Sequence, residues 1–156
     1  MTNSILEFMG KDHDRLDELF KEFRQVVYSD KNKAKNLFHD FKTGLQRHII
    51  WEEDLLFPVF DDKTGMHDTG PTAVMRTEHK HIKGFLEEIN DELVNGAAAG
   101  IENTAKELVA VLTNHNNKEE SILYQWIDES LDDKERKELF ILMNKLPVER
   151  YDECCV

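Results

Sequence analysis

Cysteine is nearly absent from this sequence of 156 residues, in which only Cys154 and Cys155 occur, side by side near the end. This scarcity excludes a disulfide framework and a cysteine-based zinc or haem site, and we interpret the pair as part of a frayed tail. No apolar run approaches the ~20 residues that a membrane span needs. The first residues show neither a basic leader nor a small-residue cleavage site. These absences predict a cytoplasmic protein.

Positive charge is also scarce, because 20 Lys and Arg residues stand against 32 Asp and Glu residues, which gives a formal net charge of −12. Such a surface should repel phosphate backbones and anionic membranes, so we expect neither nucleic acid nor a membrane as a partner. The length suits one domain with a continuous core. We predict that this domain covers residues 1–147 and that residues 148–156 form a tail.

Strand patterns are nearly missing, whereas apolar residues recur at alternating steps of three and four through most of the chain. This spacing predicts an all-α fold, and short connections between long helices favour an antiparallel up-and-down four-helix bundle. Pro58 should kink or end the second helix, and Asp132 with Glu135 resembles a capping box for a short fifth C-terminal helix. The predicted helices cover residues 4–28, 30 to 57 or 60, 71–95, 101–128 and 132–146.

Each long helix carries one apolar row that should face the core, and ionisable residues stand inside these rows. The first and third rows read Met9, His13, Leu16, Phe20, Phe23, Val27 and Met75, His79, Ile82, Leu86, Ile89, Leu93. The second row reads Phe41, Leu45, His48, Glu52, Leu55, Val59. The fourth row reads Ile101, Ala105, Leu108, Leu112, His115, Glu119, Ile122, Trp126. Two rows therefore share a His-x-x-x-Glu spacing, which places both side chains on one helix face.

Buried carboxylates among apolar side chains cost several kcal/mol per charge unless a cation compensates them. One histidine in an apolar row is more often a hydrogen-bonded core residue, but that explanation does not cover six such residues on four helices. Four imidazoles and two carboxylates suit iron, manganese or zinc, and their number suggests two ions with positions left for a solvent-derived bridge and an exogenous ligand. The candidate metal ligands are His13, His48, Glu52, His79, His115 and Glu119.

Other ionisable residues near these rows are expected to lie outside the core. Glu53 and Glu120 follow the candidate ligands but lie about 100° around the helix, so they should face solvent or support the ligands from outside. The same rotation places His39 and His81 on the surface, and His67 lies in a predicted loop.

The sequence resembles the hemerythrin family, specifically the HHE cation-binding domains, over nearly its whole length. The resemblance rests on "DHDRLDELF", "HIIWEEDLLFP", "GPTAVMRTEHKHI" and "HNNKEESILY". It implies an up-and-down four-helix bundle and a non-haem di-iron centre. In that centre, Glu52 and Glu119 would bridge the irons. His13, His48, His79 and His115 would be terminal ligands.

One position departs from the family pattern. The oxygen carriers of the family have His-x-x-x-His on the third helix, and Met75 stands where the first histidine belongs. A thioether is a poor ligand for ferric iron, so Met75 is expected to pack beside the site and to leave one iron short of a nitrogen. This favours access of water, peroxide or nitric oxide over reversible oxygen transport.

We therefore predict a di-iron protein that binds or reacts with oxygen, peroxide or nitric oxide, in a sensing, scavenging or redox role. A first alternative is an iron-responsive interaction module, in which the segment "KERKELFILMNKLP" reports metal loading to a protein partner; such a helix more often closes its own bundle. A second is repair of damaged iron centres, known in relatives with an additional cysteine-bearing amino-terminal region. This chain begins almost directly at the predicted bundle, which favours the other readings.

Overall fold

A computed structural model describes residues 3–152, and Cys154 and Cys155 lie outside this range. Every regular element within these residues is helical, which confirms the all-α prediction. The first half of the chain forms α1 (Ile5–Val26), α2 (Lys31–Ile50), η1 (Trp51–Leu56) and α3 (Phe57–Thr64). The second half forms α4 (Gly70–Val94), α5 (Ala98–Lys118), η2 (Glu119–Leu123), α6 (Tyr124–Ser130), α7 (Asp133–Asn144) and η3 (Val148–Arg150).

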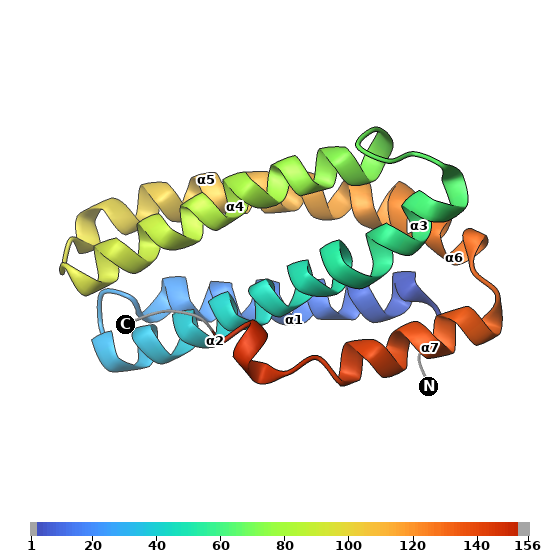
Figure 1. Ribbon diagram of the computed structural model, residues 1–156. Helices are drawn as coiled ribbons and strands as arrows, with labels where there is room; N and C mark the ends of the chain where they lie inside the picture. The colour runs from blue at the N-terminus through green and yellow to red at the C-terminus, as the bar shows by residue number, and fades with distance from the viewer. Residues whose placement is uncertain (1–2, 153–156) are drawn as a thin grey trace.

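The long helices form two hairpins that pack into a bundle. In Figure 1, α1 lies beside α2 and α4 lies beside α5, and each pair packs along its length. Helix α2 continues through η1 into α3, and α5 continues through η2 into α6. The bundle therefore has four long helical runs, two of which are interrupted by a different helical geometry.

Local sequence explains where several helices begin. The side chain of Ser4 accepts a hydrogen bond from the backbone N–H of Glu7, and Asp30 caps α2 in the same way through Lys33. Helix α7 begins with the predicted capping box of Asp132 and Glu135. Each cap satisfies backbone donors that the first turn of a helix leaves free.

The elements η1 and η2 are π-helical, so their backbone bonds span five residues instead of four. The N–H of Phe57 bonds the carbonyl of Glu52, and the N–H of Tyr124 bonds the carbonyl of Glu119. Pro58 lies in the first turn after η1, where a missing N–H is tolerated. The prediction that the second helix ends near Phe57 or Phe60 was wrong, because the helical run continues to Thr64.

Each π turn moves the buried row of the following helix by one residue. In the fourth run, Leu123 and Ile127 are buried, whereas the predicted core residues Ile122 and Trp126 are 59% and 40% exposed. The row up to Glu119 was predicted correctly, since α5 is regular there. The extra residue of η2 rotates everything beyond it relative to an α-helix.

The second run shows the same displacement. Leu56 and Phe60 are fully buried, whereas the predicted Leu55 and Val59 are only partly buried. The rows of α1 and α4, which contain no π turn, follow the predicted spacing, and only Leu93 at the end of α4 is partly buried.

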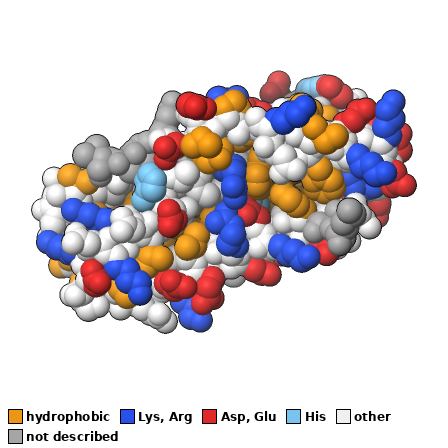
Figure 2. All heavy atoms as spheres, turned by 90° about the horizontal axis from the view of Figure 1, so that it is seen from below, with side chains coloured by type: hydrophobic (Ala, Val, Ile, Leu, Met, Phe, Trp, Pro, Cys, Tyr) orange, Lys and Arg blue, Asp and Glu red, His pale blue; other side chains and the backbone are white. Residues whose placement is uncertain are grey.

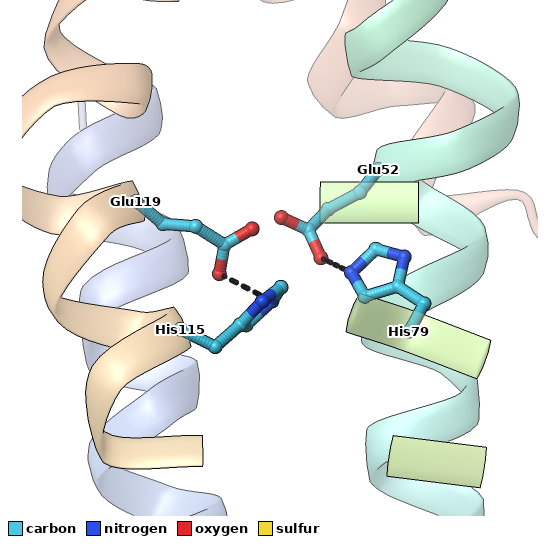
Figure 3. A group of neighbouring side chains, drawn as sticks. All are labelled: Glu52, His79, His115 and Glu119. Atoms are coloured by element: carbon cyan, nitrogen blue, oxygen red, sulfur yellow. Dashed lines mark ion pairs between the residues drawn. The ribbon is translucent and has the colours of Figure 1, made fainter. Parts of the chain in front are cut away.

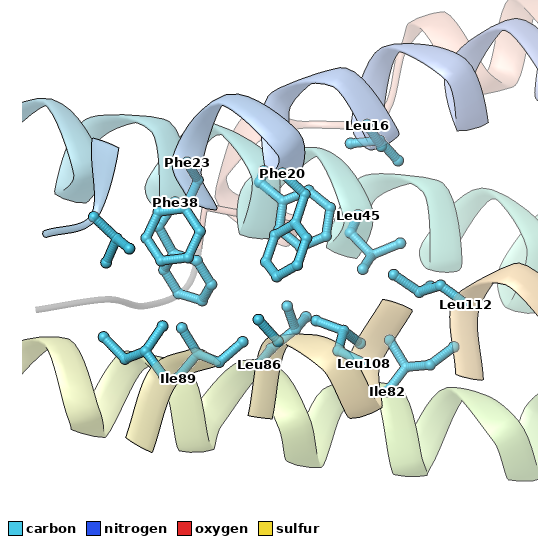
Figure 4. Packing of buried hydrophobic residues seen from close by; sticks show 14 of the residues in the cluster. Leu16, Phe20, Phe23, Phe38, Leu45, Ile82, Leu86, Ile89, Leu108 and Leu112 are labelled. Carbon is cyan, nitrogen blue, oxygen red and sulfur yellow. The ribbon is translucent and has the colours of Figure 1, made fainter. Parts of the chain in front are cut away.

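The core consists of two apolar clusters. Cluster 1, shown in Figure 4, fills the half of the bundle toward the turns within the hairpins. Its buried members are Leu16, Phe20, Phe23, Val27, Ala34, Phe38, Phe41, Leu45, Ile49, Ile82, Leu86, Ile89, Ile101, Ala105, Leu108 and Leu112. Cluster 2 comprises Ile5, Met9, Trp51, Leu56, Phe57, Phe60, Met75, Leu123, Tyr124, Ile127, Leu131, Leu139 and Met143.

Helix α7 covers the end of the bundle that holds cluster 2. Its Leu139 and Met143 are buried, and the indole N–H of Trp51 donates to the carbonyl of Met143 at 3.0 Å. The ring centroids of Phe8 and Phe140 lie 5.2 Å apart. The segment "KERKELFILMNKLP", which we considered as a helix that signals metal loading to a protein partner, thus packs on its own bundle.

The outer surface is mixed in character. Figure 2, which views the molecule from below, shows acidic, basic and apolar side chains interspersed on this face. Among residues 3–152, no helix combines the length and apolarity required to cross a bilayer. Residues 148–152, which we assigned to a tail, contact α2 and η1 through ion pairs of Asp152 with His39 and of Arg150 with Asp54.

Candidate metal centre

The six candidate ligands meet inside the bundle between the two clusters. On α1, His13 lies between Met9 of cluster 2 and Leu16 of cluster 1, and on α4, His79 lies between Met75 and Ile82 in the same way. None of the six is more than 3% exposed. The remaining four are His48 of α2, Glu52 of η1, His115 of α5 and Glu119 of η2.

Four of these side chains converge on one point, which we call subsite 1. The group comprises Glu52, His79, His115 and Glu119, each of which offers one ligand atom within 4.8 Å of the others. His79 Nε2 lies 3.3 Å from Glu52 Oε1, and His115 Nε2 lies 3.2 Å from Glu119 Oε1. Figure 3 shows the two carboxylates pointing toward one another from opposite sides of the bundle.

A second group, subsite 2, shares Glu119 with the first. His13, His48 and Glu119 again offer ligand atoms within 4.8 Å of one another. His13 Nε2 lies 3.3 Å from Glu119 Oε1, and His48 Nε2 lies 3.6 Å from Glu52 Oε1. Each carboxylate therefore contacts one histidine of each subsite, and both contacts run to the same oxygen, Oε1.

A ring of outer carboxylates surrounds the histidines. Each carboxylate directly precedes or follows a candidate ligand on its own helix and contacts the Nδ1 atom of a histidine on another helix. The ring passes from α1 to α2, to α4, to α5 and back to α1. The four pairs are Asp12 with His48, Glu53 with His79, Glu78 with His115, and Glu120 with His13.

The two contacts within hairpins are hydrogen bonds. Nδ1 of His48 lies 2.8 Å from Asp12, and Nδ1 of His115 lies 2.9 Å from Glu78. Both carboxylates are also held by cations, since Asp12 accepts from Arg15 at 3.0 Å and Glu78 pairs with Lys118. A carboxylate on Nδ1 directs Nε2 inward, which is the usual way that proteins orient a metal-binding imidazole.

The two contacts between hairpins are longer. Glu120 lies 3.5 Å from Nδ1 of His13, and Glu53 lies 3.7 Å from Nδ1 of His79. Both glutamates are partly exposed at the surface, so they face solvent and also contact the ligands from outside. Glu52 and Glu119 are fully buried. This confirms the prediction that Glu53 and Glu120 lie off the inward row of their helices.

Sequence reasoning missed Tyr124, whose hydroxyl lies within the site. The residue is fully buried, and its oxygen lies 2.9 Å from Glu52 Oε2 and 3.1 Å from Glu119 Oε1. In an α-helix, a residue five positions after Glu119 would be rotated away from it by about 140°. The π turn brings Tyr124 back to the inward face. The only available signal was the aromatic residue itself in "HNNKEESILY".

The charges of the site are strongly coupled. Burial, the largest influence, lowers the pKa of His79, but the nearby carboxylates of Glu52 and Glu53 outweigh it and raise the pKa to about 9. Burial raises the pKa of Glu52, and the neighbouring Glu119 raises it further. Burial, Glu119 and Glu52 together raise the pKa of Tyr124 well above its usual value. These shifts favour a protonated His79 and a neutral Tyr124 beside the carboxylates.

The donor set fits a metal ion. Glu52 Oε1, Glu119 Oε2 and His79 Nε2 are buried atoms without a hydrogen-bond partner among the described residues. Such unsatisfied atoms are rare in protein interiors, and a cation between them would satisfy all three. Imidazole nitrogens with carboxylate oxygens suit iron, manganese or zinc.

The remaining predictions about this region concern Met75 and the other histidines. Met75 is 3% exposed and belongs to cluster 2, one turn from His79, as expected for a residue that packs beside the site. His39, His67 and His81 are all exposed, which confirms that they lie on the surface.

Comparison with known proteins identifies the family. The family model of the hemerythrin HHE cation binding domain matches residues 4–127. The chain belongs to the hemerythrin family. All six candidate ligands of this hemerythrin-family chain fall within the matched residues, and the family description itself names cation binding.

Curated relatives are distant and longer. The chain is 24% identical over 135 residues to a DNA nickase of Nostoc sp., covering 86% of this chain and 36% of the relative. It is 25% and 27% identical over 134 residues to the iron-sulfur cluster repair protein YtfE of Escherichia coli O157:H7 and Enterobacter sp.. These matches cover 77% of this chain and 61% of each relative. The chain thus spans less than two thirds of these proteins. No solved structure is significantly similar to it.

Proposed function

We propose that this chain binds two iron ions within an antiparallel up-and-down four-helix bundle, and that the ions bind or react with oxygen, peroxide or nitric oxide. The observation that carries the proposal is the convergence of six buried histidine and glutamate side chains into two subsites that share Glu119. Two ions would neutralise the buried carboxylates and satisfy their unpaired atoms. Bound iron supplies redox chemistry and affinity for small ligands that amino-acid side chains lack.

The residues of the chain would set the properties of the ions. Glu52 and Glu119 would bridge them, and His13, His48, His79 and His115 would be terminal ligands. The outer carboxylates would hold each imidazole in place from Nδ1. Met75 contributes no nitrogen beside His79, so the ion at subsite 1 would keep a position for a small exogenous ligand.

Metal analysis combined with optical spectroscopy tests this proposal. Protein expressed with ample iron should contain about two irons per chain. Its spectrum should change when the reduced protein meets oxygen, peroxide or nitric oxide. Absence of iron, or spectra that none of these ligands alters, would refute the proposal. Anomalous scattering at the site would identify manganese or zinc if either replaces iron.

Substitution of Met75 by histidine tests the free position. Met75→His changes the core volume little and places an imidazole one turn from His79. We expect tighter binding of the second iron, a longer-lived spectral change with oxygen, and a slower reaction with peroxide. Stopped-flow spectroscopy and iron stoichiometry measure these effects. Unchanged kinetics and stoichiometry would show that position 75 does not face the metals.

Repair of damaged iron centres is the alternative that the relatives favour, since two of them are named iron-sulfur cluster repair proteins. Recovery of activity in a nitric-oxide-treated iron-sulfur enzyme, with and without this protein, tests that role. An iron-responsive interaction module is a further alternative, for which a partner should bind only the apo or only the holo protein. The expectations that nucleic acid is not a partner and that the location is cytoplasmic remain predictions.

A further inference from the structure

The hydroxyl of Tyr124 has more polar neighbours than a phenol can satisfy. Besides the two carboxylates, it lies 3.1 Å from Nε2 of His48 and 3.3 Å from Nε2 of His13. A phenol has one hydrogen to donate, so it can serve as donor to only one of these four neighbours at a time. The position of Tyr124 therefore calls for another explanation.

The four distances match the geometry of a coordination shell. With metal–ligand bonds of about 2.1 Å in an octahedron, adjacent ligand atoms lie about 3.0 Å apart, and each ligand has four such neighbours. The Tyr124 oxygen lies 2.9 to 3.3 Å from four candidate ligand atoms, two nitrogens and two oxygens. Three of these atoms, on His13, His48 and Glu119, belong to subsite 2, so the phenol oxygen has the spacing of a further ligand beside those three.

We propose that the oxygen of Tyr124 is a ligand of the ion in subsite 2, an inference that rests on the proposed iron site. When the oxygen–iron bond forms, the phenolic proton leaves to water, and no electron is transferred. This ligand makes the two ions different, because subsite 1 contains no phenol. A phenolate is a hard, anionic donor and favours ferric iron at subsite 2. The exogenous ligand is then directed to subsite 1, on the side of Met75 and His79.

The π turn at η2 is the device that makes this ligand available. The N–H of Tyr124 bonds the carbonyl of Glu119, so the bridging carboxylate and the phenol are the two ends of one π-helical bond. In a regular α-helix, the inward position would fall to residue 122 or 123, which are isoleucine and leucine here.

Resonance Raman spectroscopy of the ferric protein tests the assignment. A tyrosinate bound to ferric iron produces a visible charge-transfer band, and excitation into that band enhances the ring vibrations of the tyrosinate. We expect these vibrations in the wild-type protein, and we expect them to shift when the protein contains ring-deuterated tyrosine. Tyr124→Phe should abolish them and weaken the binding of one iron at least about tenfold. The matched control, Tyr28→Phe, alters a tyrosine that is 60% exposed and should change neither property.

The possible outcomes separate this inference from the proposed function. Wild-type protein that binds two irons without tyrosinate vibrations would overturn the inference and leave the function standing. Vibrations that persist in Tyr124→Phe would overturn it as well. Protein that binds no iron would refute both. If Tyr124→Phe fails to fold, the isotope shift in the wild-type protein still decides the question.

Discussion

The two halves of this bundle are built from similar apolar residues but differ in helical geometry. Cluster 1 lies among regular α-helices, whereas cluster 2 includes residues of the π turns η1 and η2 and of the helices that follow them. In the first half, the period of the sequence places the predicted row residues correctly, except that Leu93 is only partly buried. In the second half, the runs that contain π turns bury the residue after the expected one, such as Leu123 instead of Ile122.

The difference teaches that the metal layer is also the boundary between two helical registers. Glu52 and Glu119 are the residues whose carbonyls accept the π-type bonds, so the change of register coincides with the carboxylates. π turns recur at functional sites because the extra residue redirects side chains that a regular helix would turn away. Here the redirected side chain is Tyr124.

A further extra residue at η2 should break the register of the second half. Insertion of one alanine between Ile122 and Leu123 turns Leu123, Tyr124 and Ile127 about 100° out of the core, because the π turn already accommodates one extra residue. Each lost apolar contact costs about 2–5 kcal/mol, so we expect the melting temperature to fall by roughly 10 °C or more and iron binding to be lost. Calorimetry and metal analysis measure both effects. Deletion of Ile122 is the control, because it makes Tyr124 the fourth residue after Glu119, so an α-helix keeps the three side chains inward and the loss of stability should be much smaller. A deletion variant as unstable as the insertion variant would contradict the shifted register.

Substitution of the carboxylates at the change of register should reduce iron binding more than it reduces the stability of the fold. Glu119→Ala removes the carboxylate that both subsites share, and we expect loss of at least one iron and a lower melting temperature of the holo protein. Glu52→Ala should act similarly. Glu107→Ala, an exposed position on α5, is the control for loss of a glutamate. The neighbouring Glu120→Ala should have the smaller effect of an outer carboxylate. Retention of two irons in Glu119→Ala would exclude the bridging role.

Matched truncations sharpen the comparison between clusters. Leu108 of cluster 1 and Leu123 of cluster 2 are both at most 1% exposed, so each change to alanine should cost about 2–5 kcal/mol. Only Leu123→Ala, beside Tyr124, should also weaken iron binding. Chemical denaturation and iron titration separate the two readouts. Equal loss of iron affinity in both variants would contradict the prediction that only cluster 2 positions the metal ligands.

A change of pH should act on the metal layer before it acts on cluster 1, which consists of apolar side chains. Without metal, Glu52 and Glu53 keep His79 protonated below its pKa of about 9, so a metal ion must displace that proton. Affinity at subsite 1 should rise with pH, by up to about tenfold per unit below that pKa, and level off above it. Competition titrations between pH 6 and about 9 measure the slope. A flat profile would contradict the proton competition.

The sequence was informative where the helices are regular. The rows of α1 and α4, and those of α2 and α5 up to the carboxylates, brought all six candidate ligands to one place; their metal ligation remains a prediction. Ile122 and Trp126 were misplaced because a π turn leaves no mark in composition or period, and Tyr124 was missed for the same reason. Asp12 and Glu78 were overlooked although each directly precedes a candidate histidine, a pattern that could have revealed the outer carboxylates.

The ring of outer carboxylates has a consequence for how the protein assembles. Two of its contacts, Asp12 with His48 and Glu78 with His115, can form inside a hairpin before the hairpins meet. The contacts of Glu53 and Glu120 exist only after the hairpins have docked, and they are the longer ones. Each hairpin therefore carries half a site in which one of its two imidazoles, that of His48 or of His115, is already oriented. Iron that bound across both halves would join them, so metal capture would be the closing step of folding, and iron supply would set the amount of mature protein.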